Sequence, residues 1–261
     1  MKSHIQMPKC VLKQFIIREG SLKNQCYCYD FALKSFRVTT PDGVNTCEDY
    51  YRGELENELS GKIESPLGKL IAFIKSEDFQ KQQFHLSPDL KEVIYQYLYS
   101  LITRSPEMLQ HVEEQSLFSD FYVEQDFRSL TVAMGLATAN ENNLFRSYTP
   151  TFFMNNSNTP FILPLCGAYA VERASGEQWI YMPLTEKVAI CLLDNRSLNK
   201  YVTDGKLARF SSNNHEVIRQ LNQMAFLEQS KKGGCLISSS KEALEDAINI
   251  QNIQSFEIHQ K

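Results

Sequence analysis

A histidine close to the start of the chain, His4, is followed by Pro8, Leu12 and Phe15. Near neutral pH an imidazole can act as an acid, as a base or as a metal ligand. The proline would stiffen the backbone between the histidine and the two apolar residues, which would anchor the segment in a core. We therefore expect a docked N-terminal segment that carries His4 into a site. The alternative is a partly exposed histidine on a terminal segment.

Four glutamates, Glu54, Glu56, Glu58 and Glu64, lie in a segment with helical spacing. Paired carboxylates can share acid and base roles or bind a divalent cation. Glu54 and Glu58 share a helix face, whereas Glu56 and Glu64 differ by about 80° around a regular helix axis. The alternative to a functional cluster is the solvated face of a helix.

Arg104 ends a strongly apolar helical segment. Its guanidinium could bind a phosphate or a carboxylate with two parallel hydrogen bonds. It could equally bind the last carbonyls of its own helix, where the helix dipole favours a cation.

Seven cysteines could provide metal ligands or nucleophiles. Cys10, Cys26, Cys28 and Cys47 do not have the spacing of a zinc knuckle, so we expect no metal site. Cys166-Gly167 would be a nucleophile only beside a base, and a buried thiol is the alternative. The sequence contains no glycine-rich phosphate loop, no G-x-S-x-G and no H-E-x-x-H, and it implies no particular cofactor.

The composition is that of a globular protein, with 43% hydrophobic and 22% charged residues among 261. The formal net charge of −4, with cations spread along the chain, gives no strong signal for nucleic-acid binding. The start of the chain lacks the apolar stretch of a secretory signal, and no apolar run could span a membrane. Free cysteines then favour a cytoplasmic protein.

The pattern of elements predicts an α+β fold in a single domain over residues 1–261. Its parts are an N-terminal β-hairpin (1–47), a central helical bundle (48–140), a mainly antiparallel sheet (141–210) and a C-terminal helix, strand and helix (211–261). Residues 11–17 are expected to be a strand of the first part. Residues 88–103 are expected to form a helix capped by Ser87, and Pro66 is expected to kink or restart the helix over 48–77.

These motifs, in this order, resemble the bacterial domain-of-unknown-function family 4238. The spacing of His4, Pro8, Leu12 and Phe15 is similar to the family's H-x-x-x-P-x-x-[YF]-L-x-x-F start. The further similar stretches are Tyr29-Asp30, Tyr51 to Glu64, Ile102 to Pro106, Phe161-Ile162, Met182 to Leu184, Gln220 to Asn222 and Ser238-Ser239. After Phe-Ile the family usually carries an S-D-x-P turn, where this chain has Pro164-Leu165-Cys166-Gly167.

The resemblance implies a bacterial or phage-related setting and a role in defence against phage, but it implies no mechanism. Our leading hypothesis is an uncharacterised cytoplasmic component of phage defence or abortive infection, with a partner protein from a defence operon as one possibility. The candidate site joins His4 as acid, base or ligand, Arg104 as anion-binding group and Glu64 as the group that orients His4 or holds a cation. The alternatives are a hydrolase acting on nucleic acid or nucleotides, and a non-enzymatic sensor or interaction protein. If family enzymes use the missing aspartate, Leu165 in its place predicts an inactive or altered protein.

Overall fold

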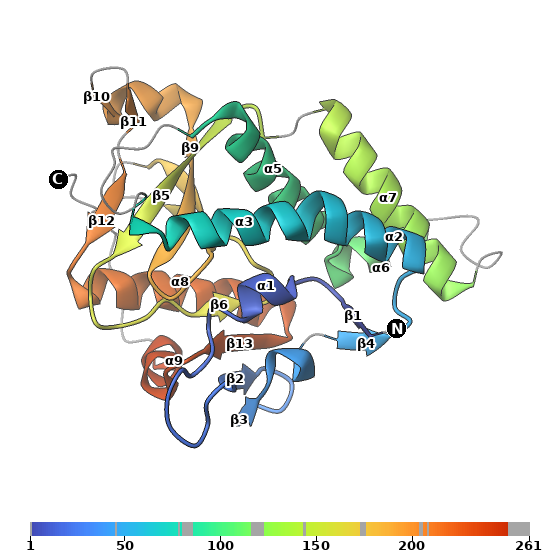
Figure 1. The fold of residues 1–261 in the computed structure, drawn as a ribbon, viewed down its shortest axis with the longest axis horizontal. Coiled ribbons are helices and arrows are strands. Elements are labelled where there is room, and N and C mark those ends of the chain that lie inside the picture. Colours follow the sequence, from blue (N-terminus) through green and yellow to red (C-terminus); the bar gives the residue numbers. More distant parts are fainter. Residues whose placement is uncertain are drawn as a thin grey trace.

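The computed structural model describes residues 2–44, 46–77, 79, 86–115, 123–142, 145–172, 176–203, 206–207 and 209–249. Within them the chain forms helices and two larger, mostly antiparallel sheets, which confirms the predicted α+β class (Figure 1). The single-domain organisation stays a prediction. No helix in these ranges is both long enough and apolar enough to cross a bilayer.

The N-terminal segment is docked, as expected, although its elements differ from the prediction. Strand β1 (Lys2–His4) pairs antiparallel with β4 (Thr46–Glu48), so that His4 lies opposite Thr46. The predicted strand over 11–17 is wrong, because Val11 and Leu12 belong to the short helix α1 (Lys9–Leu12) that follows Pro8. Pro8 is the N-cap residue with an extended ψ of 140°, and the burial of Val11 and Leu12 outweighs their β-propensity. Val11, Leu12 and Phe15 are buried in the main core.

The predicted hairpin forms between β2 (Cys26–Asp30) and β3 (Ser35–Thr39). It is not a separate unit, because β2 also pairs with β13 (Cys235–Ser238) near the other end of the sequence. With β6 (Leu163–Pro164) these strands make a four-stranded sheet in the order β3-β2-β13-β6. A 3-10 turn (Pro41–Gly43) then leads towards β4.

The helical part begins with α2 (Gly53–Leu59), a π-helical turn (Ser60–Glu64) and α3 (Ser65–Ile74), which run on as one rod in Figure 1. Helix α5 (Pro88–Thr103) has the predicted bounds, and the Ser87 hydroxyl accepts a hydrogen bond from the Leu90 backbone N–H at 3.3 Å. Helices α6 (Pro106–Gln115) and α7 (Glu124–Asn142) follow. A second apolar cluster fills the space between these helices: Tyr51, Leu55, Leu59, Ile63, Tyr99, Leu109, Val132, Leu136 and Ala139.

The second half of the chain contributes a five-stranded sheet in the order β12-β5-β9-β8-β7. Its strands are β5 (Tyr148–Asn155), β7 (Tyr169–Glu172), β8 (Gln178–Pro183), β9 (Val188–Asp194) and β12 (Phe210–Ser212). Only the β12–β5 pair is parallel in this sheet. The mainly antiparallel sheet predicted for 141–210 is confirmed, although β6 of that range joins the four-stranded sheet instead. A 3-10 helix (Asn195–Tyr201) and the small β10 (Val202–Thr203) and β11 (Lys206–Leu207) pair complete this region.

The C-terminal region has the predicted helix, strand and helix as α8 (His215–Lys232), β13 and α9 (Lys241–Ile248). Helix α8 contacts strands of both sheets, namely β7 and β12 of one and β6 and β13 of the other. Gly233 ends it at a positive φ of 73°, a conformation that glycine adopts without strain. Residues 250–261 of the predicted C-terminal part lie outside the described residues.

Gly167 lies close to Leu101 of α5. Its φ is +75°, and a Cβ there would stand 2.5 Å from Cδ1 and 2.8 Å from Cδ2 of the buried Leu101. We expect Gly167→Ala to lower the free energy of unfolding by roughly 2–4 kcal/mol, since it adds overpacking to the cost of a left-handed backbone. Gly20→Ala is the matched control, because Gly20 has φ +79° with nothing within 4 Å of its Cβ position. Urea unfolding of both variants measures the difference, and equal losses would show that Leu101 imposes no packing constraint.

Candidate functional site

Arg104 is the best-enclosed charged side chain of the predicted site. It follows α5 as the C-cap residue, and its side chain is 1% exposed. Its Nε donates a hydrogen bond to the Ile5 carbonyl at 3.1 Å, and Nη2 donates to the His4 carbonyl. Nη1 lies 3.7 Å from Oε1 of Glu64. The guanidinium therefore joins the end of α5 to the N-terminal segment and to the π-helical turn.

Tyr51 completes the enclosure of Arg104. The Arg104 Cζ atom lies over the Tyr51 ring, 5.6 Å from its centroid, and the Tyr51 hydroxyl donates to the Ile5 carbonyl at 2.8 Å. Burial raises the pKa of Tyr51 to about 12, so the phenol stays a neutral donor. Our sequence reasoning did not single out this residue, although it lies in a stretch similar to the family.

The π-helical turn places Glu64 beside a second glutamate. The Ser65 N–H donates to the Ser60 carbonyl, a bond that spans five residues and not four. One extra residue in the turn rotates the following side chains back by about 100°, so Glu56 and Glu64 fall within about 20° of one face. Pro66 explains the wide turn, because its ring has no N–H to donate and would crowd a regular helix. The expected loose alignment of Glu56 and Glu64 is therefore wrong.

Electrostatics distinguish Glu64 from the other glutamates of this segment. Burial raises the pKa of the Glu64 carboxyl, the Arg104 guanidinium partly opposes that rise, and Glu56 adds to it. Glu54 and Glu58 are exposed, and Glu58 Oε1 lies 2.7 Å from Lys62 Nζ one turn away. Glu54 and Glu58 therefore agree with the alternative interpretation, in which they form part of the solvated face of the helix.

His4 meets this site through its backbone more than through its ring. Its carbonyl accepts from Arg104, whereas its Nε2 lies 3.9 Å from Oδ1 of Asp42. Asp42 also pairs with Lys9, with 2.5 Å between Oδ1 and Nζ. The structure thus brings Arg104 against both Glu64 and His4, but the ion pair of the imidazole is with Asp42. Sequence reasoning missed Asp42, which is 38 residues from His4 and lies in no motif.

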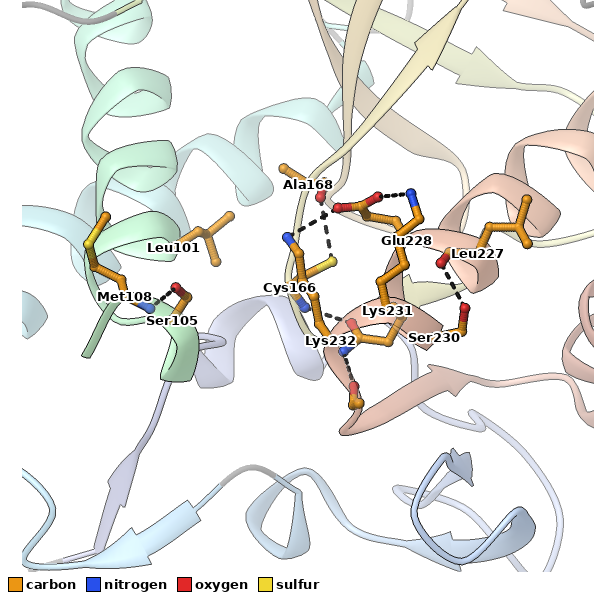
Figure 2. A network of polar contacts seen from close by, with 12 residues as sticks. Leu101, Ser105, Met108, Cys166, Ala168, Leu227, Glu228, Ser230, Lys231 and Lys232 are labelled. Carbon is orange, nitrogen blue, oxygen red and sulfur yellow. Dashed lines mark hydrogen bonds and ion pairs between the residues drawn. The ribbon is translucent and has the colours of Figure 1, made fainter. Parts of the chain in front are cut away.

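Cys166 does not have the environment of a nucleophile. Its thiol donates to the Ala168 carbonyl at 3.4 Å, and burial raises its pKa to about 11, so that the thiol is protonated near neutral pH (Figure 2). The charged neighbours in Figure 2, Glu228 with Lys231 and Lys232, pair with one another. Leu165 beside it is buried, and its N–H donates to the Cys235 carbonyl at 3.3 Å.

The four cysteines weighed as zinc ligands lie in different settings. Cys10 contacts the Glu64 carbonyl at 3.8 Å, Cys47 is exposed on β4, and Cys26 and Cys28 are buried on the same side of β2. Among the described residues no group of three or more His, Cys, Asp or Glu side chains could hold a metal ion.

A cavity of about 180 Å³ lies elsewhere, between α5 and the edge of the five-stranded sheet. It contains none of the predicted site residues; its charged lining groups are Lys91 and Arg209. The Arg209 guanidinium already donates to the Phe79 carbonyl at 2.5 Å and lies over the Phe79 ring. The cavity is otherwise largely apolar, so it offers fewer reactive groups than the surroundings of Arg104.

Comparison with known proteins finds one family match, in the N-terminal part of the chain. No curated protein and no solved structure matches it. Residues 6–130 match the family described as "Protein of unknown function (DUF4238)". The matched segment contains Glu56, Glu64 and Arg104, begins two residues after His4 and ends before the turn at Leu165. The predicted resemblance is thus confirmed for this segment: residues 6–130 are similar to the DUF4238 family of unknown function.

Proposed function

We propose that this protein is a cytoplasmic hydrolase of nucleotide-like substrates that serves in bacterial defence against phage, with Glu64 as its acid–base group. The setting in defence rests on the family resemblance. The chemistry rests on the surroundings of Glu64.

The observation that carries the proposal is a set of buried polar atoms around Glu64 whose hydrogen-bonding capacity is not used. In the part of the chain that the structure describes, Glu56 Oε1 and Arg104 Nη1 are buried without a hydrogen-bond partner. Leaving such an atom unpaired costs about 1–3 kcal/mol, and more when it is charged. Each such atom in a native structure needs an explanation, and a bound ion or a catalytic role is one of them. A ligand with an anionic oxygen for Nη1 and a donor for Glu56 would satisfy both atoms.

The Glu64 carboxyl has the environment of a general acid or base. Its pKa is raised by burial, and this shift moves it towards the pH at which proton transfer is most effective. In the ionised form it would take a proton from water as the water oxygen bonds to phosphorus, and the phosphate ester bond would break with the electron pair leaving on the ester oxygen. Arg104 Nη1 would hold an oxygen of the phosphate.

The charge of the protein favours a small substrate. Binding the phosphate backbone of DNA or RNA requires several cations on one surface. This chain has a formal net charge of −4, and the arginine of its site, Arg104, is paired with Glu64. A nucleotide needs only one anion contact together with donors on its sugar and base. Nucleotides therefore fit the site better than polymers do.

The test is a substrate panel with the full chain. Purified protein is incubated with mono- and dinucleotides, RNA and DNA, with and without Mg²⁺ or Mn²⁺, and the products are separated by chromatography. We expect turnover of at least one nucleotide and none of the polymers. Inertness towards the whole panel would overturn the proposed hydrolase.

The role in defence has its own test. Expression of the chain in a bacterial host should lower the plaque count of at least one phage in a diverse set. Equal counts with and without expression would overturn the defence role, whatever the result of the substrate panel.

A further inference from the structure

Three cysteines that are distant in sequence share one face of the four-stranded sheet. Cys235 of β13 lies opposite Asp30 of β2, and Ile237 lies opposite Cys28. Alternate residues of a strand face the same side, so Cys26, Cys28 and Asp30 share their face with Cys235. Cys28 and Cys235 are therefore diagonal neighbours, close enough for each thiol to shift the pKa of the other.

Arg37 lies next to this pair of thiols. Arg37 of β3 lies directly opposite Cys28, and its Nη2 lies 3.8 Å from the Cys235 sulfur. The Asp30 Oδ2 atom lies 3.8 Å from the same sulfur. The Arg37 side chain is exposed at the sheet edge, whereas Cys235 is 7% exposed and Cys28 is 0% exposed. Cys235 is thus the thiol nearer to solvent and to the positive charge.

The two thiols differ in their readiness to ionise. Interaction with the Cys28 thiol and with Arg37 lowers the pKa of Cys235, against the effects of burial and of Asp30. Interaction with the Cys235 thiol and burial raise the pKa of Cys28. Burial also raises the pKa of Cys26, to about 12. One thiolate beside a protonated partner is the arrangement found in reactive cysteine pairs.

We propose that Cys235 and Cys28 form a peroxide-sensitive pair, in which Cys235 is oxidised first and Cys28 then closes a disulfide with it. The Cys235 thiolate attacks one oxygen of hydrogen peroxide, the O–O bond breaks, hydroxide leaves and a sulfenic acid remains. The Cys28 sulfur then attacks the Cys235 sulfur, the S–O bond breaks, and water forms with the Cys28 proton. Peroxide is reduced and the two thiols are oxidised, with two electrons transferred.

Closing the bond to a sulfur–sulfur distance of about 2.05 Å requires a small backbone movement, because diagonal neighbours stand about 7–8 Å apart and disulfides rarely span more than about 7 Å between Cα atoms. Gly233 and Gly234, both with positive φ, directly precede Cys235 at the start of β13. The disulfide would tie β13 to β2 and so would link the C-terminal strand to the N-terminal hairpin.

The experiment compares thiols within one protein. The full chain is treated with a small excess of hydrogen peroxide, free thiols are alkylated, and the peptides are mapped by mass spectrometry. Cys47 is the internal control, because it is exposed on β4. We expect Cys235 to be lost about tenfold faster than Cys47 and to appear in a Cys28–Cys235 disulfide. Cys28→Ser should leave a trappable sulfenic acid at Cys235, and Arg37→Gln should slow the loss of Cys235.

The wild-type measurement is decisive even if a variant folds poorly. Faster oxidation of Cys47 than of Cys235, or the absence of the Cys28–Cys235 linkage, would overturn the proposal. An Arg37→Gln protein that reacts as fast as the wild type would show that the guanidinium does not activate the thiol and would overturn its part in the pair.

Discussion

Replacing Arg104 by methionine should lower the free energy of unfolding by about 3–5 kcal/mol, the usual cost of removing one partner from a buried ion pair. The variant keeps an apolar stem of similar length but removes the donors to the His4 and Ile5 carbonyls. Both carbonyls and the Glu64 carboxylate then lose their partner in a partly buried setting. Strand β1 would lose the contact that holds it against the end of α5.

Urea unfolding measures this loss, and Arg196→Met is the matched control. The Arg196 side chain is 90% exposed and pairs locally with Asp194, so its replacement should change the free energy of unfolding by less than about 0.5 kcal/mol. Limited proteolysis should cleave within residues 2–5 faster in Arg104→Met than in the wild type or in Arg196→Met. A decrease in the free energy of unfolding of less than about 1 kcal/mol would mean that Arg104 does not hold the N-terminal segment in place.

Local signals predicted the helices of this protein well. The 88–103 helix has a serine N-cap, a proline in its first turn and a wide apolar stripe, and these signals agree with one another. The segment over 11–17 was different, because its β-branched residues suggested a strand while Pro8 and the burial of Val11 and Leu12 produced a helix turn. Tertiary packing decides such short segments, and a single sequence does not contain it.

The spacing of apolar residues could have predicted the π-helical turn. Leu55, Leu59, Ile63 and Leu67 are separated by three successive steps of four, which would drift by roughly 120° around a regular helix. All four are buried, and one extra residue in the turn reduces that drift to about 20°. In this chain the run of equal four-residue steps that spans Pro66 indicates the π-helical turn.

The candidate site was predictable only in part. Arg104 and Glu64 do meet, as expected, because one ends α5 and the other ends the π-helical turn that α5 contacts. The pairing of His4 with Asp42 depends on how β1 docks along β4, which no local pattern encodes. The contact of Cys28 with Cys235 likewise arises from a strand pairing across about two hundred residues, and sequence separation of that size hides it.

The stability of the wild type should depend on pH through Glu64. Its pKa is higher in the folded protein than in the unfolded chain because of burial. A raised folded pKa gives a contribution that is complete below the unfolded value and is lost as pH rises through the folded value. The free energy of unfolding should therefore fall over the pH range above the ordinary glutamate pKa of about 4.3. Glu64→Gln should remove that fall.

The same substitution should abolish catalysis if the proposed function is right. Glu64→Gln keeps the size of the side chain and its contact with Arg104, but it can neither accept nor release a proton at this position. Removing a general acid or base typically costs a factor of about 10²–10⁴ in rate, so turnover of the nucleotide found in the substrate panel should fall by that amount. The loss should appear in kcat more than in KM, because Arg104 would still bind the anion.

Glu58→Gln separates this effect from a general change of charge on the helix. Glu58 lies on the same helical rod, is exposed, and pairs with Lys62 one turn away. It should leave both the turnover and the pH dependence of stability unchanged. If Glu64→Gln kept more than a tenth of the wild-type kcat while removing the pH-dependent fall in stability, the carboxyl would be a structural partner of Arg104, and the reactive group would have to be sought elsewhere in the protein.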